Sequence, residues 1–273
     1  MDGGVTFNEH DIAYLAGPVR AIAERAGVAI MEVRARGFDV TKKDDRTPVT
    51  DADYAAEAEI LPALGELTPG IPVLSEEAAA KGDTPEFDDN PIWVVDPLDG
   101  TREFVDGGTE FAVCIGLVVN RRPVFGLIHG PAMALTYWNV GPTSALRAEG
   151  RGVGVSVSTR TVPSAGHTVI TSRFHTKPGR LDQFLGTLQM SRRILMSSAL
   201  KFGLLADGSA DIYPRFGPTC EWDTAAGHAI LAAAGGNVTT LDGVELAYGK
   251  AEFLNPGFIA CGTEAGAQAR DQD

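Results

Sequence analysis

Five short apolar runs between residues 71 and 138 constrain the fold of this chain more than any other feature. They read IPVL, IWVV, FAVCIGLVV, PVFGLIHG and ALTYW, and turn-forming residues separate them. Runs of this length that are rich in β-branched and aromatic side chains are typical of strands, and short connections between them favour a meander. The sequence therefore predicts a sheet in the middle of the chain.

Two helices are predicted before this sheet. Apolar residues recur at helical spacing from Ile12 to Ala26, and Pro18 is a candidate kink inside that segment. Further along, Thr50 and Asp53 have the spacing of a capping box for a second helix, ADYAAEAEILPAL. A side chain that caps the first turn makes a helix start at this point favourable.

The second half of the chain has a different pattern. A passage rich in Gly, Ser, Thr and Pro, roughly from Gly150 to Gly166, is the best candidate for a boundary. Within it, GRGVGVSVS is expected to be a hairpin turn, because it lacks the lysine and the following helix of a P-loop. Beyond it, strand-like and helix-like stretches alternate: TVIT, LDQFLGTLQ, SALKFGLLADG, DIYP, DTAAGHAILAAAGG and GFIACG. We therefore predict an α+β half over residues 1–152 and an α/β half over residues 153–273.

Composition excludes several classes of partner. With 36 acidic and 23 basic residues the net charge is −13, which argues against nucleic acid or an anionic membrane as the main partner. The sequence has no apolar stretch of roughly 20 residues and no signal-peptide pattern, so a cytoplasmic protein without integral membrane association is expected. Three widely spaced cysteines suggest inert thiols, and His129 and His228 are expected to be packed rather than catalytic. The oligomeric state stays open, with a homodimer among the alternatives.

The motif WVVDPLDGTREF indicates a metal site. A strand that ends at Val95 places Asp96 at its carboxyl edge, where α/β proteins bind ligands, and Pro97 fixes the backbone so that Asp99 returns beside it. Two such close carboxylates repel each other unless a cation lies between them. Mg²⁺ prefers oxygen ligands of this kind, and the Leu98 carbonyl is a further candidate.

The residues that follow are suited to a phosphate. Gly100 and Thr101 are expected to begin a helix whose free N–H groups can bind a phosphate oxygen. The alternative is that the two aspartates only cap a turn. Three more motifs argue against that alternative, since PVTDAD, VLSEE and EWDTAAG bring Asp51, Glu76 and Asp223 to other helix starts or strand ends.

Taken in order, PVTDAD, LSEE, WVVDPLDGT and EWDTAAGHAILAAAGG resemble the inositol monophosphatase superfamily of Mg²⁺-dependent, lithium-sensitive phosphatases. In the second half, SSALKF, IYPRFGPTCEWDTAAGH and EFLNPGF are similar to the CysQ-type 3'(2'),5'-bisphosphate nucleotidase branch rather than to the inositol or fructose branches. The resemblance covers nearly the whole chain. It implies a layered α/β fold, the αβαβα sandwich of the sugar-phosphatase type.

The resemblance also implies roles for individual residues. The implied metal ligands are Glu76, Asp96, the Leu98 carbonyl, Asp99 and Asp223, which would hold two or three Mg²⁺ ions. Li⁺ is expected to inhibit the enzyme. Asp51 and Thr101 would orient and deprotonate the attacking water, with Glu76 as a further catalytic residue. Metal ions that neutralise a phosphate and activate water make a serine or cysteine nucleophile unnecessary.

The implied substrate is a small phosphorylated molecule, adenosine 3',5'-bisphosphate, whose 3'-phosphate would be hydrolysed to give AMP. The implied substrate contacts are Leu98, Asp99, Gly100, Thr101, His175, Ser198, Lys201, Arg215 and Asp223. Of these, Lys201 and Arg215 would bind the second phosphate; the alternative is that they are surface charges and that His175 caps a turn. A broader inositol- or sugar-phosphate phosphatase, and a non-catalytic metal- or nucleotide-binding relative, are the alternative functions.

Overall fold

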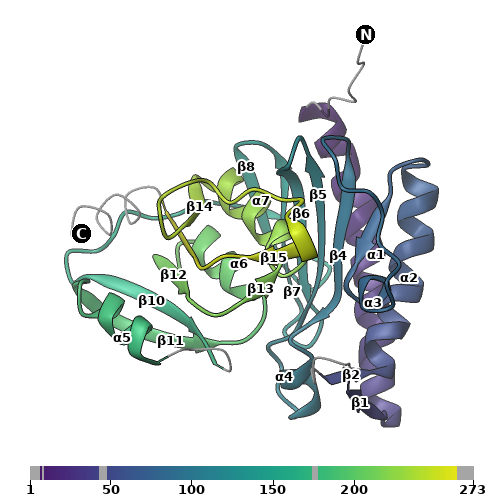
Figure 1. Ribbon diagram of the computed structural model, residues 1–273, viewed down its shortest axis with the longest axis horizontal. Coiled ribbons are helices and arrows are strands. Elements are labelled where there is room, and N and C mark those ends of the chain that lie inside the picture. The colour runs from purple at the N-terminus through teal and green to yellow at the C-terminus, as the bar shows by residue number, and fades with distance from the viewer. Residues whose placement is uncertain (1–6, 8, 43–47, 174–177, 263–273) are drawn as a thin grey trace.

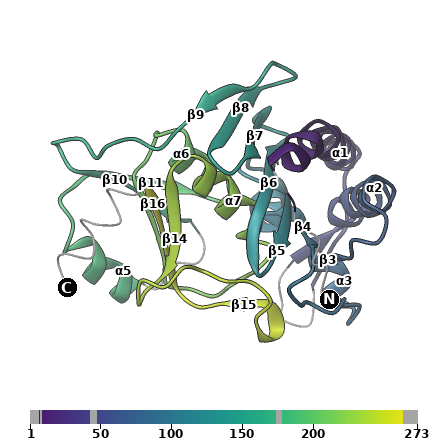
Figure 2. The same ribbon diagram turned by 90° about the horizontal axis from the view of Figure 1, so that it is seen from above.

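The computed structural model describes residues 7, 9–42, 48–173 and 178–262. Its secondary structure forms alternating layers (Figure 1). Seen from above, two long helices, a seven-stranded sheet, a pair of short helices, a five-stranded sheet and a last short helix follow one another (Figure 2). This arrangement confirms the predicted αβαβα sandwich.

The two predicted N-terminal helices form the outer layer. Helix α1 spans Glu9–Arg36 and continues through Pro18, and helix α2 spans Asp51–Leu67. The apolar stripe of α1 is buried with α2 against one face of the seven-stranded sheet. The predicted capping box at the start of α2 is confirmed, because the Thr50 hydroxyl accepts the Ala52 N–H while Asp53 accepts the Thr50 N–H.

The five predicted runs are strands of one sheet with the order β3-β4-β5-β6-β7-β8-β9. All neighbours are antiparallel except β3 and β4. The strands are β3 (Val73–Ser75), β4 (Ile92–Asp99), β5 (Ala112–Val119), β6 (Arg122–Gly130), β7 (Leu135–Gly141), β8 (Ser144–Glu149) and β9 (Val155–Val157). The predicted hairpin joins β8 to β9, so this sheet continues past the proposed boundary at residue 152.

Short elements connect this sheet to the rest of the chain. Strands β1 (Val40–Lys42) and β2 (Pro48–Thr50) pair antiparallel before α2. Helix α3 (Glu76–Ala80) follows β3, and helix α4 (Thr101–Val105) follows β4. Both short helices therefore begin where a strand of the sheet ends.

The second half forms a five-stranded sheet with the order β11-β10-β12-β16-β14, and a separate pair β13-β15. Its elements are β10 (His167–Ser172), α5 (Pro178–Leu185), β11 (Met190–Met196), α6 (Leu200–Ala206), β12 (Ile212–Arg215), β13 (Thr219–Cys220), α7 (Ala225–Ala233), β14 (Gly236–Thr240), the 3-10 turn η1 (Ala251–Phe253), β15 (Leu254–Asn255) and β16 (Phe258–Gly262). The predicted alternation is confirmed. It missed β11 and β14, the two edge strands of the sheet.

The middle layer is held tightly against the first sheet. Helix α7 crosses β5 and β6 at glycines, and a Cβ atom added to Gly126 would lie 2.1 Å from the Ala226 carbonyl oxygen. Only a residue without a side chain permits this approach. The close packing fixes the start of α7, and with it the turn that carries Asp223, relative to the end of β4.

Both histidines singled out in the sequence are packed, as predicted. His129 Nδ1 lies 2.9 Å from the Thr136 hydroxyl, and His228 Nδ1 lies 3.2 Å from the Tyr248 hydroxyl. Burial lowers the pKa of His129 to about 4 and that of His228 to about 3. None of the helices in the described part of the chain combines the length and the apolar composition that a membrane crossing needs.

Candidate active site

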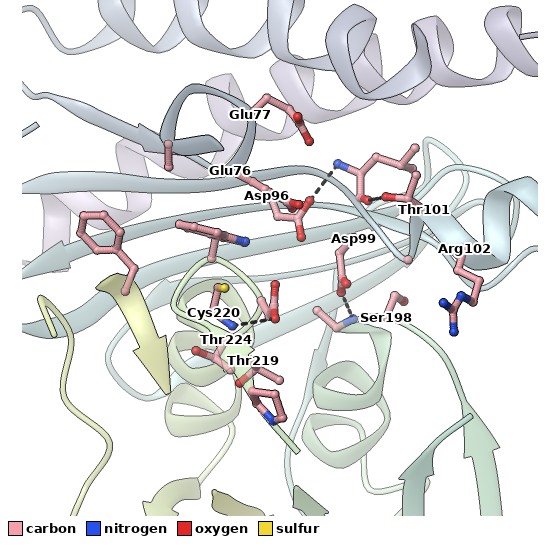
Figure 3. Close-up of a pocket in the computed structure, with 18 of the residues that line it drawn as sticks. Glu76, Glu77, Asp96, Asp99, Thr101, Arg102, Ser198, Thr219, Cys220 and Thr224 are labelled. Atoms are coloured by element: carbon pink, nitrogen blue, oxygen red, sulfur yellow. Dashed lines mark hydrogen bonds between the residues drawn. The ribbon is translucent and has the colours of Figure 1, made fainter. Parts of the chain in front are cut away.

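A cavity of about 930 Å³ lies where the two halves meet at the end of β4. Residues of α3, β4, α4, α6, β12 and β13 line it, so both halves contribute to its walls. Figure 3 shows Asp96 and Asp99 on the side of β4, and Ser198, Cys220 and Thr224 on the side of the second half. The motif that indicated a metal site thus lies in the cavity.

The turn at the end of β4 is irregular. The strand continues to Asp99 rather than ending at Val95, but its pairing with β5 is interrupted between Asp96 and Asp99. The Leu98 N–H donates to Asp96 Oδ1 over 3.0 Å, which holds that carboxylate over the turn. Gly100 follows with a φ of 95°, a conformation that favours glycine.

Three carboxylates form the centre of the site. Asp96, Asp99 and Asp223 each place an oxygen within 4.8 Å of the others. Burial raises the pKa of Asp99, and burial followed by repulsion from Asp99 and Glu76 raises the pKa of Asp223 to about 8. Three carboxylates so placed cannot all carry a negative charge without a cation. Their oxygen chemistry and spacing fit a hard divalent metal ion.

Two further predicted ligands lie beside this cluster. Glu76 is the first residue of α3, and its charge acts on Asp53, Asp99 and Asp223. The Leu98 carbonyl accepts the Thr101 hydroxyl over 3.1 Å and lines the cavity. Their direct coordination of a metal stays a prediction.

The structure corrects the predicted pairing of Asp51 with Thr101. The Thr101 hydroxyl donates to Asp53 Oδ1 over 3.1 Å, whereas Asp51 is an exposed residue at the first position of α2. Asp53 is buried and also accepts the Thr50 N–H and hydroxyl, each over 2.8 Å. Burial raises its pKa to about 6. The capping-box spacing was the sequence signal for Asp53, because it places the side chain back toward the start of the helix.

The two cations predicted for a second phosphate also line the cavity. Lys201 and Arg215 are both 5% exposed, so the alternative that they are surface charges is wrong. The Lys201 ammonium donates to the Ser198 carbonyl and lies 5.2 Å from the centre of the Tyr213 ring. Burial lowers the pKa of Lys201 to about 8, although Asp99 opposes this shift.

Arg215 and Ser198 both line the cavity. Arg215 lies in β12, and its Nη2 donates to the Pro218 carbonyl over 3.1 Å. Ser198 has a φ of 56°, an uncommon conformation for a residue with a side chain. His175, the remaining predicted substrate contact, lies outside the described residues.

An aromatic wall of the cavity was missed. Trp222 and Phe253 line it with ring centres 6.1 Å apart, and Phe253 has a φ of 54°. They belong to two of the motifs quoted above, IYPRFGPTCEWDTAAGH and EFLNPGF, but no spacing rule relates the two segments, so only tertiary structure places the rings together. Such faces suit a flat ring.

The comparisons with known proteins agree with this geometry. The family model described as "Inositol monophosphatase family" matches residues 12–270. The chain is 42% identical over 248 residues to the 3'(2'),5'-bisphosphate nucleotidase CysQ of Salmonella typhimurium, covering 87% of this chain and 95% of the relative. It is 41% identical over 244 residues to the CysQ of Escherichia coli K12, with the same coverage.

Solved structures show the same fold. The crystal structure of CysQ from Bacteroides thetaiotaomicron superposes with a TM-score of 0.74 at 35% identity, covering 91% of this chain and 97% of that one. The suhB protein of Bartonella henselae superposes with a TM-score of 0.73 at 23% identity, covering 95% and 98%. By its sequence, its fold and its carboxylate cluster, the chain belongs to the inositol monophosphatase family.

Proposed function

We propose that this chain is a CysQ-type 3'(2'),5'-bisphosphate nucleotidase. It uses Mg²⁺ to hydrolyse the 3'-phosphate of adenosine 3',5'-bisphosphate, which gives AMP and inorganic phosphate. One observation carries the proposal: the same cavity contains a carboxylate cluster suited to metal ions and two buried cations, Lys201 and Arg215. The 42% identical relative carries the same enzyme name.

The two charged regions match the two phosphates of such a substrate. The scissile phosphate belongs at the carboxylate cluster, where metal ions and the backbone N–H groups at Gly100 and Thr101 can meet its oxygens. The second phosphate extends beyond those metals, and in a chain of net charge −13 it needs its own cations. Carboxylates of the cluster act on Lys201 and Arg215, and metal ions bound there would take up that negative charge, so a phosphate would offset the lost hydration of the two buried cations.

The metal set is part of the proposal. Two or three Mg²⁺ ions would be held by Glu76, Asp96, the Leu98 carbonyl, Asp99 and Asp223, with Li⁺ as an inhibitor. When bound, the ions neutralise phosphate oxygens and lower the pKa of a coordinated water. Asp96 and Asp99 at the end of β4 would hold the ions from the first half, and Asp223, in the turn before α7, would hold them from the second half.

The proton leaves the water through residues of the chain itself. Thr101 Oγ1 accepts a proton from the attacking water and passes its own hydroxyl proton to Asp53 Oδ1, 3.1 Å away. The Thr50 N–H and hydroxyl hold the Asp53 carboxylate in place for this transfer. The oxygen of the water then forms the new bond to phosphorus while the bond from phosphorus to the 3' ester oxygen breaks, and that oxygen takes up a proton from water to become the 3'-hydroxyl of AMP.

The alternatives lack this charge match. A phosphatase for inositol monophosphate would have no second phosphate to offset Lys201 and Arg215. A non-catalytic relative would have no need for a complete carboxylate cluster together with the Thr101–Asp53 pair. We place the enzyme in the cytoplasm, where it would clear a by-product of sulfate activation, and a homodimer is a further expectation.

A phosphate-release panel tests the assignment. The purified chain with Mg²⁺ is assayed on adenosine 3',5'-bisphosphate, inositol 1-phosphate and fructose 1,6-bisphosphate. We expect the highest kcat/KM on the nucleotide. A preference for inositol 1-phosphate or fructose 1,6-bisphosphate would assign the chain to another branch, and no release from any of the three would support the non-catalytic alternative.

A further inference from the structure

Two glutamates of the first half bind one serine of the second half at the edge of the cavity. Glu110 Oε2 accepts the Ser197 N–H over 2.9 Å, and Glu103 Oε2 accepts the Ser197 hydroxyl over 3.0 Å. Arg173, which directly follows β10, donates to both oxygens of Glu110 over 3.0 and 2.9 Å. The four side chains join α4 and the loop before β5 to the ends of β10 and β11.

Ser197 begins the segment that carries a predicted phosphate-binding cation. Two residues later, the Ala199 N–H donates to the Asp99 carboxylate. Lys201 then lies in the first turn of α6, with its ammonium on the Ser198 carbonyl. Carboxylates of the first half therefore hold the Ser197–Lys201 segment at two points, one at the carboxylate cluster and one at Glu110.

The hydrogen bonds to Ser197 matter more than the ion pair. The Arg173 side chain is 39% exposed, and ion pairs between exposed groups stabilise weakly. Ser197 is buried, so a lost acceptor would leave its N–H without a partner away from water. The glycine at position 108 leaves room for the Glu103 carboxylate that accepts the Ser197 hydroxyl, because a Cβ atom on Gly108 would lie 1.9 Å from Glu103 Oε1.

We propose that Glu110, assisted by Glu103, is a positioning residue for recognition of the second phosphate. This inference rests on the proposed nucleotidase function. By fixing Ser197, Glu110 sets where the Ser197–Lys201 segment lies and thereby directs Lys201 toward the phosphate that is not cleaved. The scissile phosphate is proposed to lie at the carboxylate cluster, which the Ala199 N–H and not Ser197 joins to this segment.

The test compares two substrates that differ only in the second phosphate. Adenosine 3',5'-bisphosphate and adenosine 3'-monophosphate share the base and the scissile ester, so the ratio of their kcat/KM values reports recognition of the 5'-phosphate. Glu110→Ala is expected to lower this ratio about tenfold, through a raised KM for the bisphosphate, with kcat/KM for the monophosphate within about threefold of wild type. Glu110→Gln keeps an oxygen for the Ser197 N–H and should restore most of the ratio.

A matched control removes an exposed glutamate that does not line the cavity. Glu149 forms an ion pair with Arg147, and its side chain is 74% exposed, so Glu149→Ala should leave the ratio unchanged. Equal losses on both substrates in Glu110→Ala would assign Glu110 to the fold or the metal site and overturn the inference. An unchanged ratio would overturn it as well. A wild-type ratio near one would overturn the proposed function, and the inference with it.

A double substitution tests the route through Lys201. If Glu110 acts by placing Lys201, then Glu110→Ala should add little to the drop in the ratio that Lys201→Ala already causes. Losses that multiply fully would show that Glu110 acts on the substrate independently of Lys201, and would overturn the positioning role. Thermal unfolding of each variant confirms that the compared proteins are folded.

Discussion

Asp53→Asn is expected to lower kcat by about 10²-fold or more, whereas Asp51→Asn should leave it within about threefold of wild type. The two aspartates occupy the same first turn of α2. Asp53, however, is 2% exposed and lies 3.1 Å from the Thr101 hydroxyl, while Asp51 is exposed. The comparison therefore changes one carboxylate to an amide in almost the same local backbone.

The expected loss follows from the contacts of Asp53. An asparagine oxygen can still accept the Thr50 N–H and hydroxyl, so the cap of α2 should survive in large part. The Thr101 hydroxyl loses its contact with a charged acceptor but still donates to the Leu98 carbonyl, so the cost is about 1 kcal/mol of stability and a few degrees in Tm. The amide cannot take a proton from Thr101, and general-base help of this kind is worth about 10²- to 10⁴-fold in rate.

The assay is steady-state phosphate release from adenosine 3',5'-bisphosphate at saturating Mg²⁺. Because neither variant changes the residues proposed for the second phosphate, KM should change little in both. If Asp53→Asn kept the wild-type kcat, the proton acceptor would have to be reassigned. If Asp51→Asn lowered kcat as much as Asp53→Asn, Asp51 would again be a candidate for the residue that accepts the proton.

Other perturbations test the metal site, the substrate site and the packing. Excess chelator should abolish phosphate release and added Mg²⁺ should restore it; unchanged release in chelator would contradict the metal mechanism. Arg215→Ala should cost about 2–4 kcal/mol in kcat/KM on adenosine 3',5'-bisphosphate but far less on inositol 1-phosphate, and equal losses would give Arg215 a structural role. Gly126→Ala forces a Cβ atom to within 2.1 Å of the Ala226 carbonyl, so it should lower unfolding stability by about 1–3 kcal/mol in urea titrations. His228 has a folded pKa of about 3, below its unfolded value, so the unfolded chain binds the proton first and stability falls as pH drops from about 6.5 toward 3. For this reason the protein should be about 2 kcal/mol less stable at pH 5 than at pH 8. In His228→Asn, the difference in unfolding free energy between pH 5 and pH 8 should be smaller by that amount.

Strands and helices that bury a face could be predicted from the sequence because burial leaves a local pattern. The run FAVCIGLVV is β5, all of which is buried, and the capping box at Thr50 marked the start of α2. The edge strands β11 and β14 escaped prediction because a strand at the edge of a sheet does not need an apolar run. Most of β11 is exposed, and its sequence contains two adjacent arginines.

The carboxylate cluster could be predicted in part, because local sequence pattern also marks where elements begin and end. Asp96 and Asp99 follow a buried strand, and Asp223 precedes a helix, so turn chemistry alone brought them to element ends. The capping-box spacing indicated where the Asp53 side chain points, but local pattern could not say which aspartate of this turn contacts Thr101. That choice depends on Thr101, far along the chain from α2.

Only tertiary structure decided the contacts between the halves. Glu110 meets Ser197 across a sequence separation of 87 residues, and no spacing rule relates two loops so far apart. Lys201 and Arg215 could be named from the sequence, but their burial could not. The physical reason is that periodicity and capping reflect hydrogen bonds and burial within one element, whereas the partner of a side chain is set by how separate elements pack together.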